Sequence, residues 1–376
     1  MDEGAIIGRR GVNRERLQQA SARLGEAAID PRVWPEILEQ ISNAAGARGA
    51  VLLQGDSRTA DVPRTSEVDE FVDSYFAEGW HTRDIRAERA VPLLLAGAKV
   101  VTDRDILAPE EMQRAGLYAE SLIPHGLRWF AGIGFWAGPA LWGLTIQRTD
   151  REGPFGGEDK RLFAELSQRL SETATLSYAV GRLVLEGMTN ALQLIHQAAI
   201  ALDRSGAVLG MNPAAEQMFD DEFRVRNRRI FVRDKKARST LDIFIDQIRT
   251  MPDTAALPAA PIVVRRERKR PLIIQILPID GAARTPFLGA RALLALSDLD
   301  LAAKPDSTTF AKAFGLSRAE AALASLLGTG LSPRQAAEQL GVTYETARTQ
   351  LKAIFAKTGV HRQSELVALL TRPSLK

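Results

Sequence analysis

The segment Leu316–Leu370, LSRAEAALASLLGTGLSPRQAAEQLGVTYETARTQLKAIFAKTGVHRQSELVALL, carries the strongest local folding signals in the chain. Ser317-Arg-Ala-Glu320 and Ser332-Pro-Arg-Gln335 are capping boxes. In such a box a serine and an acidic or amide side chain accept hydrogen bonds from the unpaired backbone amides at the start of a helix. Gly341 and Gly359 are typical of helix ends. The segment therefore predicts four consecutive helices. A short helix, a tight turn at Gly341 and a longer helix after it form a helix-turn-helix.

The longer helix has two chemically different faces. Ala347, Leu351 and Ile354 form an apolar stripe, whereas the opposite face carries Arg348 and Thr349 near the helix start, where a recognition helix meets base edges. Arginine binds guanine with two hydrogen bonds, threonine contacts the thymine methyl, and neighbouring cations bind phosphates. The residues expected to contact DNA are Arg348, Thr349, Lys352, Arg334, Lys357 and Thr343, of which Lys352, Arg334 and Lys357 are the expected phosphate partners. The alternative is a four-helix interaction module with ordinary solvated charges.

This segment resembles the C-terminal DNA-binding domain of the LuxR/FixJ-type regulators over about sixty residues. Ala347, Gln350 and Thr358 depart from the family's pattern, which usually has valine, histidine and leucine there. These departures leave the basic face intact and bear on which DNA sequence is recognised. The resemblance implies a homodimer on double-stranded DNA with two half-sites. The matching positions are Leu316, Glu320, Gly330, Ala337, Leu340, Val342, Thr346, Arg348, Leu351, Ile354, Lys357, Gly359 and Val360.

Charge and composition restrict the classes of function. Residues 307–376 hold nine Lys and Arg against four Asp and Glu, and the rest of the chain holds 40 against 42, so the basic charge lies at the C-terminal end. That asymmetry is typical of a nucleic-acid-binding tail. The chain has no cysteine and only four widely separated histidines, so we expect no metal and no cofactor. The N-terminus lacks the order of a signal peptide, and we expect a cytoplasmic protein.

A chain of 376 residues is too long for one ordinary domain. We expect a multidomain α+β protein: a first domain at 1–156, a linker helix at 157–188, a second domain at 189–303, and an all-α four-helix domain at 307–376. The linker helix would pair with its twin in a short coiled coil. The stretch Trp129–Ile146 has no charge over eighteen residues, near the minimum for a membrane span. Its glycines and the Gly138-Pro139 turn favour a buried hairpin, so we expect no membrane contact.

The second domain opens with IALDRSGAVLGMNPAAEQMF at residues 200–219, which predicts strand, turn, strand and a helix capped by Asn212. Three later strand-like runs begin at Ile262, Leu272 and Ala292. This order resembles a PAS domain, and the resemblance implies a five-stranded sheet. Two basic clusters, at 224–238 and 265–270, are expected to be solvated loops; the alternative is that they supplement phosphate binding.

The first domain contains Phe71-x3-Tyr75-x8-Asp84. This spacing resembles the Trp…Tyr…Asp-Pro motif of acyl-homoserine-lactone-binding domains, with Phe71 for tryptophan and Ile85 for proline, and Gly126-Leu-Arg128 resembles a second stretch of them. The resemblance implies a GAF-like α/β sandwich that binds a small molecule other than the lactone itself. Alternatively, Phe71 and Tyr75 are core residues and Asp84 caps a helix or pairs with an arginine. The candidate ligand-binding residues are Tyr75, Asp84, Phe71, Trp80, Trp129 and Trp142, and Phe135 and Trp136 would join the aromatic walls if the hairpin faces inward.

Together these patterns predict a DNA-binding transcriptional regulator whose DNA binding is controlled by a small molecule in the first domain. The alternative is control by a protein partner, with the upstream domains serving as interaction and dimerisation modules. We expect no enzymatic activity, because the sequence lacks a metal cluster, a phosphate-binding glycine loop and a nucleophile motif.

Overall fold

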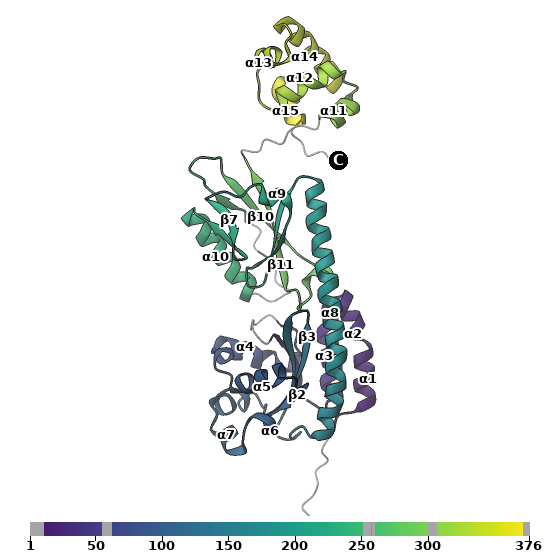
Figure 1. Cartoon of the computed structure of the whole chain (residues 1–376), viewed down its shortest axis with the longest axis vertical. Helices are drawn as coiled ribbons and strands as arrows, with labels where there is room; N and C mark the ends of the chain where they lie inside the picture. The colour runs from purple at the N-terminus through teal and green to yellow at the C-terminus, as the bar shows by residue number, and fades with distance from the viewer. Residues whose placement is uncertain (1–10, 55–61, 251–256, 258–259, 300–306, 371–376) are drawn as a thin grey trace, which may run out of the picture.

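The computed structural model describes residues 11–54, 62–250, 257, 260–299 and 307–370. Within them the chain is a multidomain α+β protein with two main sheets, a small two-stranded sheet and a C-terminal group of helices (Figure 1). The part of the chain that the structure describes contains no helix long and apolar enough to cross a membrane. The uncharged stretch that raised that alternative forms the hairpin of strands β3 (Trp129–Ala137) and β4 (Ala140–Arg148), as the glycine pattern predicts.

The first sheet is antiparallel, in the order β1-β4-β3-β2, with β1 at Gly49–Gln54 and β2 at Val100–Thr102. Alternate side chains of a strand point to opposite faces, and each face of this sheet has its own core. Helices α1 (Arg14–Ala22), α2 (Leu24–Ile29) and α3 (Trp34–Ala44) accompany one face. The other face packs against α4 (Asp69–Ala77), α5 (Ile85–Leu95), α6 (Asp103–Ile106), α7 (Pro109–Arg114) and the short helix η4 (Leu117–Leu122).

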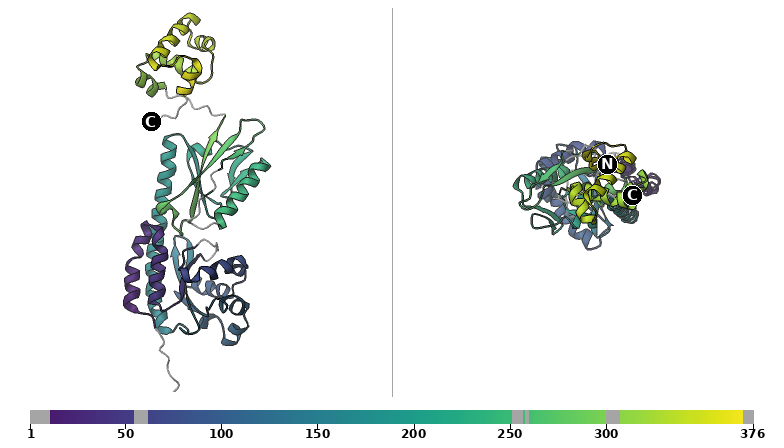
Figure 2. Two further views of the ribbon diagram at one scale, coloured as in Figure 1. Left: turned by 180° about the vertical axis from the view of Figure 1, so that it is seen from behind. Right: turned by 90° about the horizontal axis from the view of Figure 1, so that it is seen from above.

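Helix α8 (Gly157–Leu194) runs beside both sheets (Figure 2). Its first half supplies Leu162, Phe163 and Leu166 to the core of the first sheet, and Leu185 lies in a core cluster with Ala199 of the second sheet. Helix α8 ends at Leu194, six residues beyond the end of the predicted linker helix 157–188. It is also more than a connector, because both of its halves are built into packed cores.

The second sheet has five strands, which is the predicted number. They are antiparallel and lie in the order β6-β5-β11-β10-β9. Asn212 caps the short helix α9 (Pro213–Glu216), with Pro213 at its first position, also as predicted. The short helix η5 (Gly281–Arg284) and helix α10 (Lys235–Thr250) pack against this sheet. Leu241 and Phe244 of α10 are buried in the core of the sheet. The strands are β5 (Ala198–Asp203), β6 (Val208–Met211), β9 (Ile262–Val264), β10 (Leu272–Pro278) and β11 (Ala290–Asp298).

The first basic cluster is not a loop, which corrects the prediction. Strands β7 (Phe223–Arg226) and β8 (Arg229–Val232) form a two-stranded hairpin, and the cluster continues into the first turns of α10. The hairpin turns at Asn227 and Arg228, which have positive φ values of 50° and 58°. Phe223 and Val232 bury their side chains at its open end, while the arginines at its tip stay exposed.

The four predicted C-terminal helices are present: α12 (Arg318–Gly328), α13 (Pro333–Leu340), α14 (Tyr344–Thr358) and α15 (Gln363–Leu370). Both predicted capping boxes form, and Gly341 and Gly359 end α13 and α14 in the left-handed conformation. A fifth helix, α11 (Ser307–Phe314), was not predicted. Its Phe310 side chain packs against the hydrophobic core that the other C-terminal helices form.

Candidate nucleic-acid interface and ligand cavity

Helices α13 and α14 form the helix-turn-helix. Ala336, Ala337 and Ala347 are buried where the two helices meet, and their small side chains allow the backbones to approach closely. Gly341 adopts φ 67° in the turn, and the Thr343 hydroxyl accepts a hydrogen bond from the Thr346 amide, 3.2 Å away, to cap α14. These local features fix the crossing of the helices and leave one face of α14 uncovered within the described residues.

That uncovered face carries the predicted base contacts. Arg348, Thr349 and Lys352 are exposed on α14, as is Arg334 near the start of α13. The Arg348 guanidinium lies 3.7 Å from the Glu345 carboxylate, and the pair is solvent-exposed, so it would open at little cost. The Thr349 hydroxyl donates to the Glu345 carbonyl 2.9 Å away. The geometry brings guanidinium, methyl and ammonium groups together on one helical face.

Lys357 occupies a different environment from the other predicted contacts. Its ammonium group lies 2.6 Å from a Glu320 carboxylate oxygen, and Glu320 also closes the capping box at Ser317. Bonding to Lys357, and then to the Ser317 amide, holds the pKa of Glu320 below its usual value. Because the charge of Lys357 is compensated inside the domain, a phosphate contact by this residue requires the pair to open. Its observed contact joins α14 to the start of α12.

The second candidate site is a cavity in the first region, by which we mean the first sheet and the helices packed on it. The cavity lies between this sheet and helices α4 and α5. The space inside the cavity and in front of its open mouth together amounts to about 890 Å³. Its walls are mainly aliphatic and aromatic side chains, with a few polar groups among them, which is the usual composition of small-molecule sites. The polar groups are Gln54, Tyr75, Asp84, Arg86, Thr145 and Gln147.

Tyr75 and Asp84 meet at the wall of this cavity. The Tyr75 hydroxyl donates to Asp84 Oδ2 at 2.7 Å, and Asp84 Oδ1 accepts from the amides of Arg86 and Ala87 at the start of α5. Asp84 is therefore both a helix cap and a group on the cavity wall, so the two interpretations of its role are compatible. Phe71 also lines the cavity, and its ring lies 5.8 Å from that of Tyr75.

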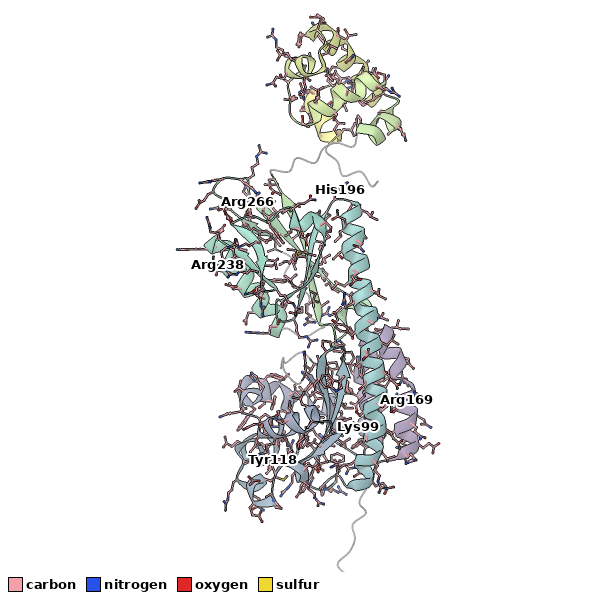
Figure 3. The ribbon with its side chains drawn as sticks, in the orientation of Figure 1. Lys99, Tyr118, Arg169, His196, Arg238 and Arg266 are labelled. Atoms are coloured by element: carbon pink, nitrogen blue, oxygen red, sulfur yellow. The ribbon has the colours of Figure 1, made fainter. Side chains whose placement is uncertain are left out.

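Arg86 is a cavity residue that the sequence patterns did not single out. Its side chain is buried and donates to the Tyr118 hydroxyl (2.9 Å), Gln147 Oε1 (3.1 Å) and the Arg128 carbonyl (2.6 Å), and it pairs with Asp103 at 3.1 Å. Burial by itself would lower the pKa of Arg86, but the nearby charge of Asp103 raises it, so the guanidinium stays charged. Burial also raises the pKa of Tyr118, shown in Figure 3, so its hydroxyl remains protonated.

Of the three tryptophans predicted for this site, Trp142 is among the residues that line the cavity, whereas Trp80 and Trp129 are not. Trp80 is buried outside the cavity wall and donates from Nε1 to Glu78 (3.0 Å), and Trp129 is half-buried outside the wall as well. Trp142 lines the cavity as predicted, but its ring packs in the core on the opposite face of the sheet, where it meets Phe287. Phe135 points to that same opposite core, and Trp136 is 44% exposed. Neighbouring residues of a strand alternate between faces, which explains why one hairpin cannot aim all of its aromatic rings at one cavity.

Comparisons with known proteins add little. No family model matches the chain, and no curated protein matches it. Among solved structures, one match is the phage VqmA–DPO complex, with 14% identity over 50% of this chain and 88% of that chain and a TM-score of 0.20. Another is the E. coli DhaR(N)–DhaL complex, with 13% identity over 77% of this chain and 91% of that chain and a TM-score of 0.25. Likenesses this weak carry no argument about function.

Proposed function

We propose that this protein is a DNA-binding transcriptional regulator, not an enzyme, and that α14 is its recognition helix. The observation that carries the proposal is the exposed face of α14, where Arg348, Thr349 and Lys352 stand together while Ala347 and Ile354 are buried beneath them. A helix presented in this way by a capped partner helix fits the major groove. Arg348 would specify guanine, whereas Arg334 and Lys352 would hold phosphates.

The experiment that tests DNA binding is enrichment of random-sequence duplexes on the full chain, followed by affinity measurements on the enriched sequence. A palindromic or paired consensus is expected, because a dimer reads two half-sites. Failure to enrich any sequence, together with an affinity that does not exceed that for a random duplex, would refute specific regulation.

We further propose that a small molecule controls this activity from the cavity of the first region. The first region would be a GAF-like sensor domain and the second a PAS-like domain, and α8 would connect them rigidly. The Tyr75–Asp84 pair supports the proposal, because a hydrogen-bonded polar group on a mainly apolar wall would orient the polar head of a ligand. A thermal-shift screen of the full chain against metabolites, homoserine lactones and aromatic acids tests this idea. A flat screen with a co-purifying partner would instead favour control by a protein.

The proposed homodimer would form along α8. Three large apolar side chains of this helix are exposed: Leu176 (53%), Leu183 (68%) and Leu194 (75%). Leu176, Val180 and Leu183 follow the four- and three-residue steps of a coiled-coil seam, and Leu194 lies eleven residues further along the helix. Two copies packed in this way would set the separation of their DNA-binding domains.

A further inference from the structure

The second region comprises the second sheet, the β7–β8 hairpin and helix α10. Its two basic clusters are separate in sequence and lie side by side in the structure. Residues 220–238 and 265–270 together hold thirteen Lys and Arg against five Asp and Glu. The Arg265 amide donates to Asp234 Oδ2 at 2.8 Å, and the Glu267 amide donates to both carboxylate oxygens of Glu222 at 3.1 Å. These bonds join the connection between β9 and β10 to the segments that flank the β7–β8 hairpin. Figure 3 shows Arg238 and Arg266 on these segments.

Four of the five acidic side chains of this area, those of Asp220, Asp221, Glu222 and Asp234, bond inside it, and that of Glu267 is exposed. Asp234 also caps α10 by accepting from the Lys236 amide at 3.0 Å. Asp220 pairs with Lys269 at 2.9 Å and with Arg266 at 3.5 Å, and Asp221 lies 3.8 Å from Arg224. These four carboxylates therefore hold the backbone and the inner cations in place, and among the described residues none of them forms an ion pair with the side chain of an outer cation.

The outer cations form what we call the basic face: Arg233, Lys235, Lys236, Arg265 and Arg268. All five are exposed, and none of their side chains makes a hydrogen bond or ion pair with another described residue. Lys235 and Lys236 occupy the first turn of α10, where positive charge opposes the helix dipole. Mutual repulsion and this unfavourable placement cost stability, so the arrangement does not serve the fold. A partner with closely spaced negative charges would offset the cost.

The basic face also lies where the chain leaves for the DNA-binding region. The Arg266 guanidinium, between Arg265 and Arg268 in the sequence, holds the Asp298 carboxylate at 2.5 and 3.0 Å, and Asp298 is the last residue of β11. Helix α11 begins at Ser307, nine residues later. Nine residues span at most about 30 Å, which is the length of roughly nine base pairs of DNA.

We propose that the basic face binds the phosphate backbone of the duplex held by α14, as a second contact that does not depend on base sequence. This inference rests on the proposed function. Closely spaced phosphates match a cluster of exposed cations, and each phosphate neutralised makes the affinity more sensitive to salt. The recognition helix would then select the site, and the second region would fix the duplex on its flank.

The test compares full-length proteins on random-sequence duplexes of about 40 and about 16 base pairs, at about 50 and 200 mM salt. One variant combines Lys235→Gln, Lys236→Gln, Arg265→Gln and Arg268→Gln. A control variant, Arg16→Gln, Lys99→Gln, Arg104→Gln and Arg169→Gln, removes the same charge from exposed positions of the first region and its helix; Figure 3 shows Lys99 and Arg169 there. A third variant, Arg348→Ala with Lys352→Ala, reports on the recognition helix.

The basic-face variant is expected to bind the longer duplex roughly 10- to 100-fold more weakly than the wild type, with a salt slope smaller by about two to four. The control variant is expected to match the wild type, and the defect is expected to shrink on the short duplex, which extends less far past α14. Equal affinity and salt slope of the basic-face variant and the wild type would overturn the inference while leaving the recognition helix intact. If that variant instead lost binding to phosphatidylglycerol vesicles, the face would serve a membrane surface. A wild type that binds no duplex would overturn the proposed function as well.

Discussion

The Trp142 indole lies edge-on to the Phe287 ring, with the ring centroids 5.0 Å apart. Phe287 follows η5 in the second region and also contacts Trp34 and Phe135, so its ring is inserted into the core of the first region. Leu141 and Gly143, the neighbours of Trp142 on β4, line the cavity on the other face of the sheet. One strand therefore separates the cavity from the contact between the two regions.

This contact predicts that the two regions unfold together. Phe287→Ala leaves a void among three aromatic rings and should cost about 3–5 kcal/mol. Differential scanning calorimetry of the wild type should show one transition for both regions, and the variant should show two. The buried Phe244, which lies in the core of the second sheet alone, provides the control. Phe244→Ala should lower the melting temperature without splitting the transition, and an unsplit transition in Phe287→Ala would contradict the coupling.

The cavity predicts a specific role for the charge of Asp84. Asn caps helices about as well as Asp, so Asp84→Asn should retain the start of α5 while it removes the negative charge on the cavity wall and the Oδ2 acceptor of the Tyr75 hydroxyl. A compound that raises the melting temperature of the wild type should then lose most of this effect. Asp30→Asn, at another helix cap outside the cavity, should respond as the wild type does. An undiminished shift in Asp84→Asn would place the ligand elsewhere.

Glu320 predicts a pH dependence of the C-terminal helices. Its folded-state pKa is held below the usual value of 4.5, chiefly by Lys357, so its contribution is present above pH 4.5 and lost as the pH falls below it. Glu320→Gln keeps an acceptor for the capping box and removes the ion pair. It should lower the stability at neutral pH by about 1 kcal/mol. Its stability should also change less than that of the wild type between pH 5 and pH 3, measured by circular dichroism; parallel curves would contradict this role.

The exposed face of α8 predicts the oligomeric state. Leu183→Glu with Leu176→Glu places two charges on the proposed seam and should convert a dimer into a monomer in light scattering after size-exclusion chromatography. The control is Ile243→Glu, because Ile243 is an exposed apolar residue of α10 (57%). A wild type that is monomeric at micromolar concentration, or a double variant that remains dimeric, would remove α8 as the dimer contact.

The parts of the fold that were predictable are those determined by residues close together in the sequence. Capping boxes and glycine stops mark the C-terminal helices, and the order around Asn212 marks the second sheet. The β7–β8 hairpin was missed because Arg228 adopts a positive φ that usually signals glycine or asparagine. Its turn therefore gave no glycine signal, and its arginines resembled those of a loop.

The candidate site was predictable to a similar extent. The exposed face of α14 follows from helical periodicity, and Tyr75 and Asp84 are brought together by a spacing of nine residues. The Arg86–Asp103–Tyr118 cluster joins residues up to 32 positions apart, and no local pattern predicts such contacts. Strand alternation decides the direction of Trp142, which required the register of β4 to be known.

The central claim, that α14 reads DNA, is tested most directly by the affinity of the full chain for its enriched duplex, measured by fluorescence anisotropy for the wild type, Arg348→Ala and Arg318→Ala. Arg348→Ala should weaken binding by about 1–3 kcal/mol and relax the preference at one base pair of each half-site. Arg318→Ala, at an exposed position of α12, should match the wild type. Equal affinity and equal sequence preference in the wild type and Arg348→Ala would contradict the account.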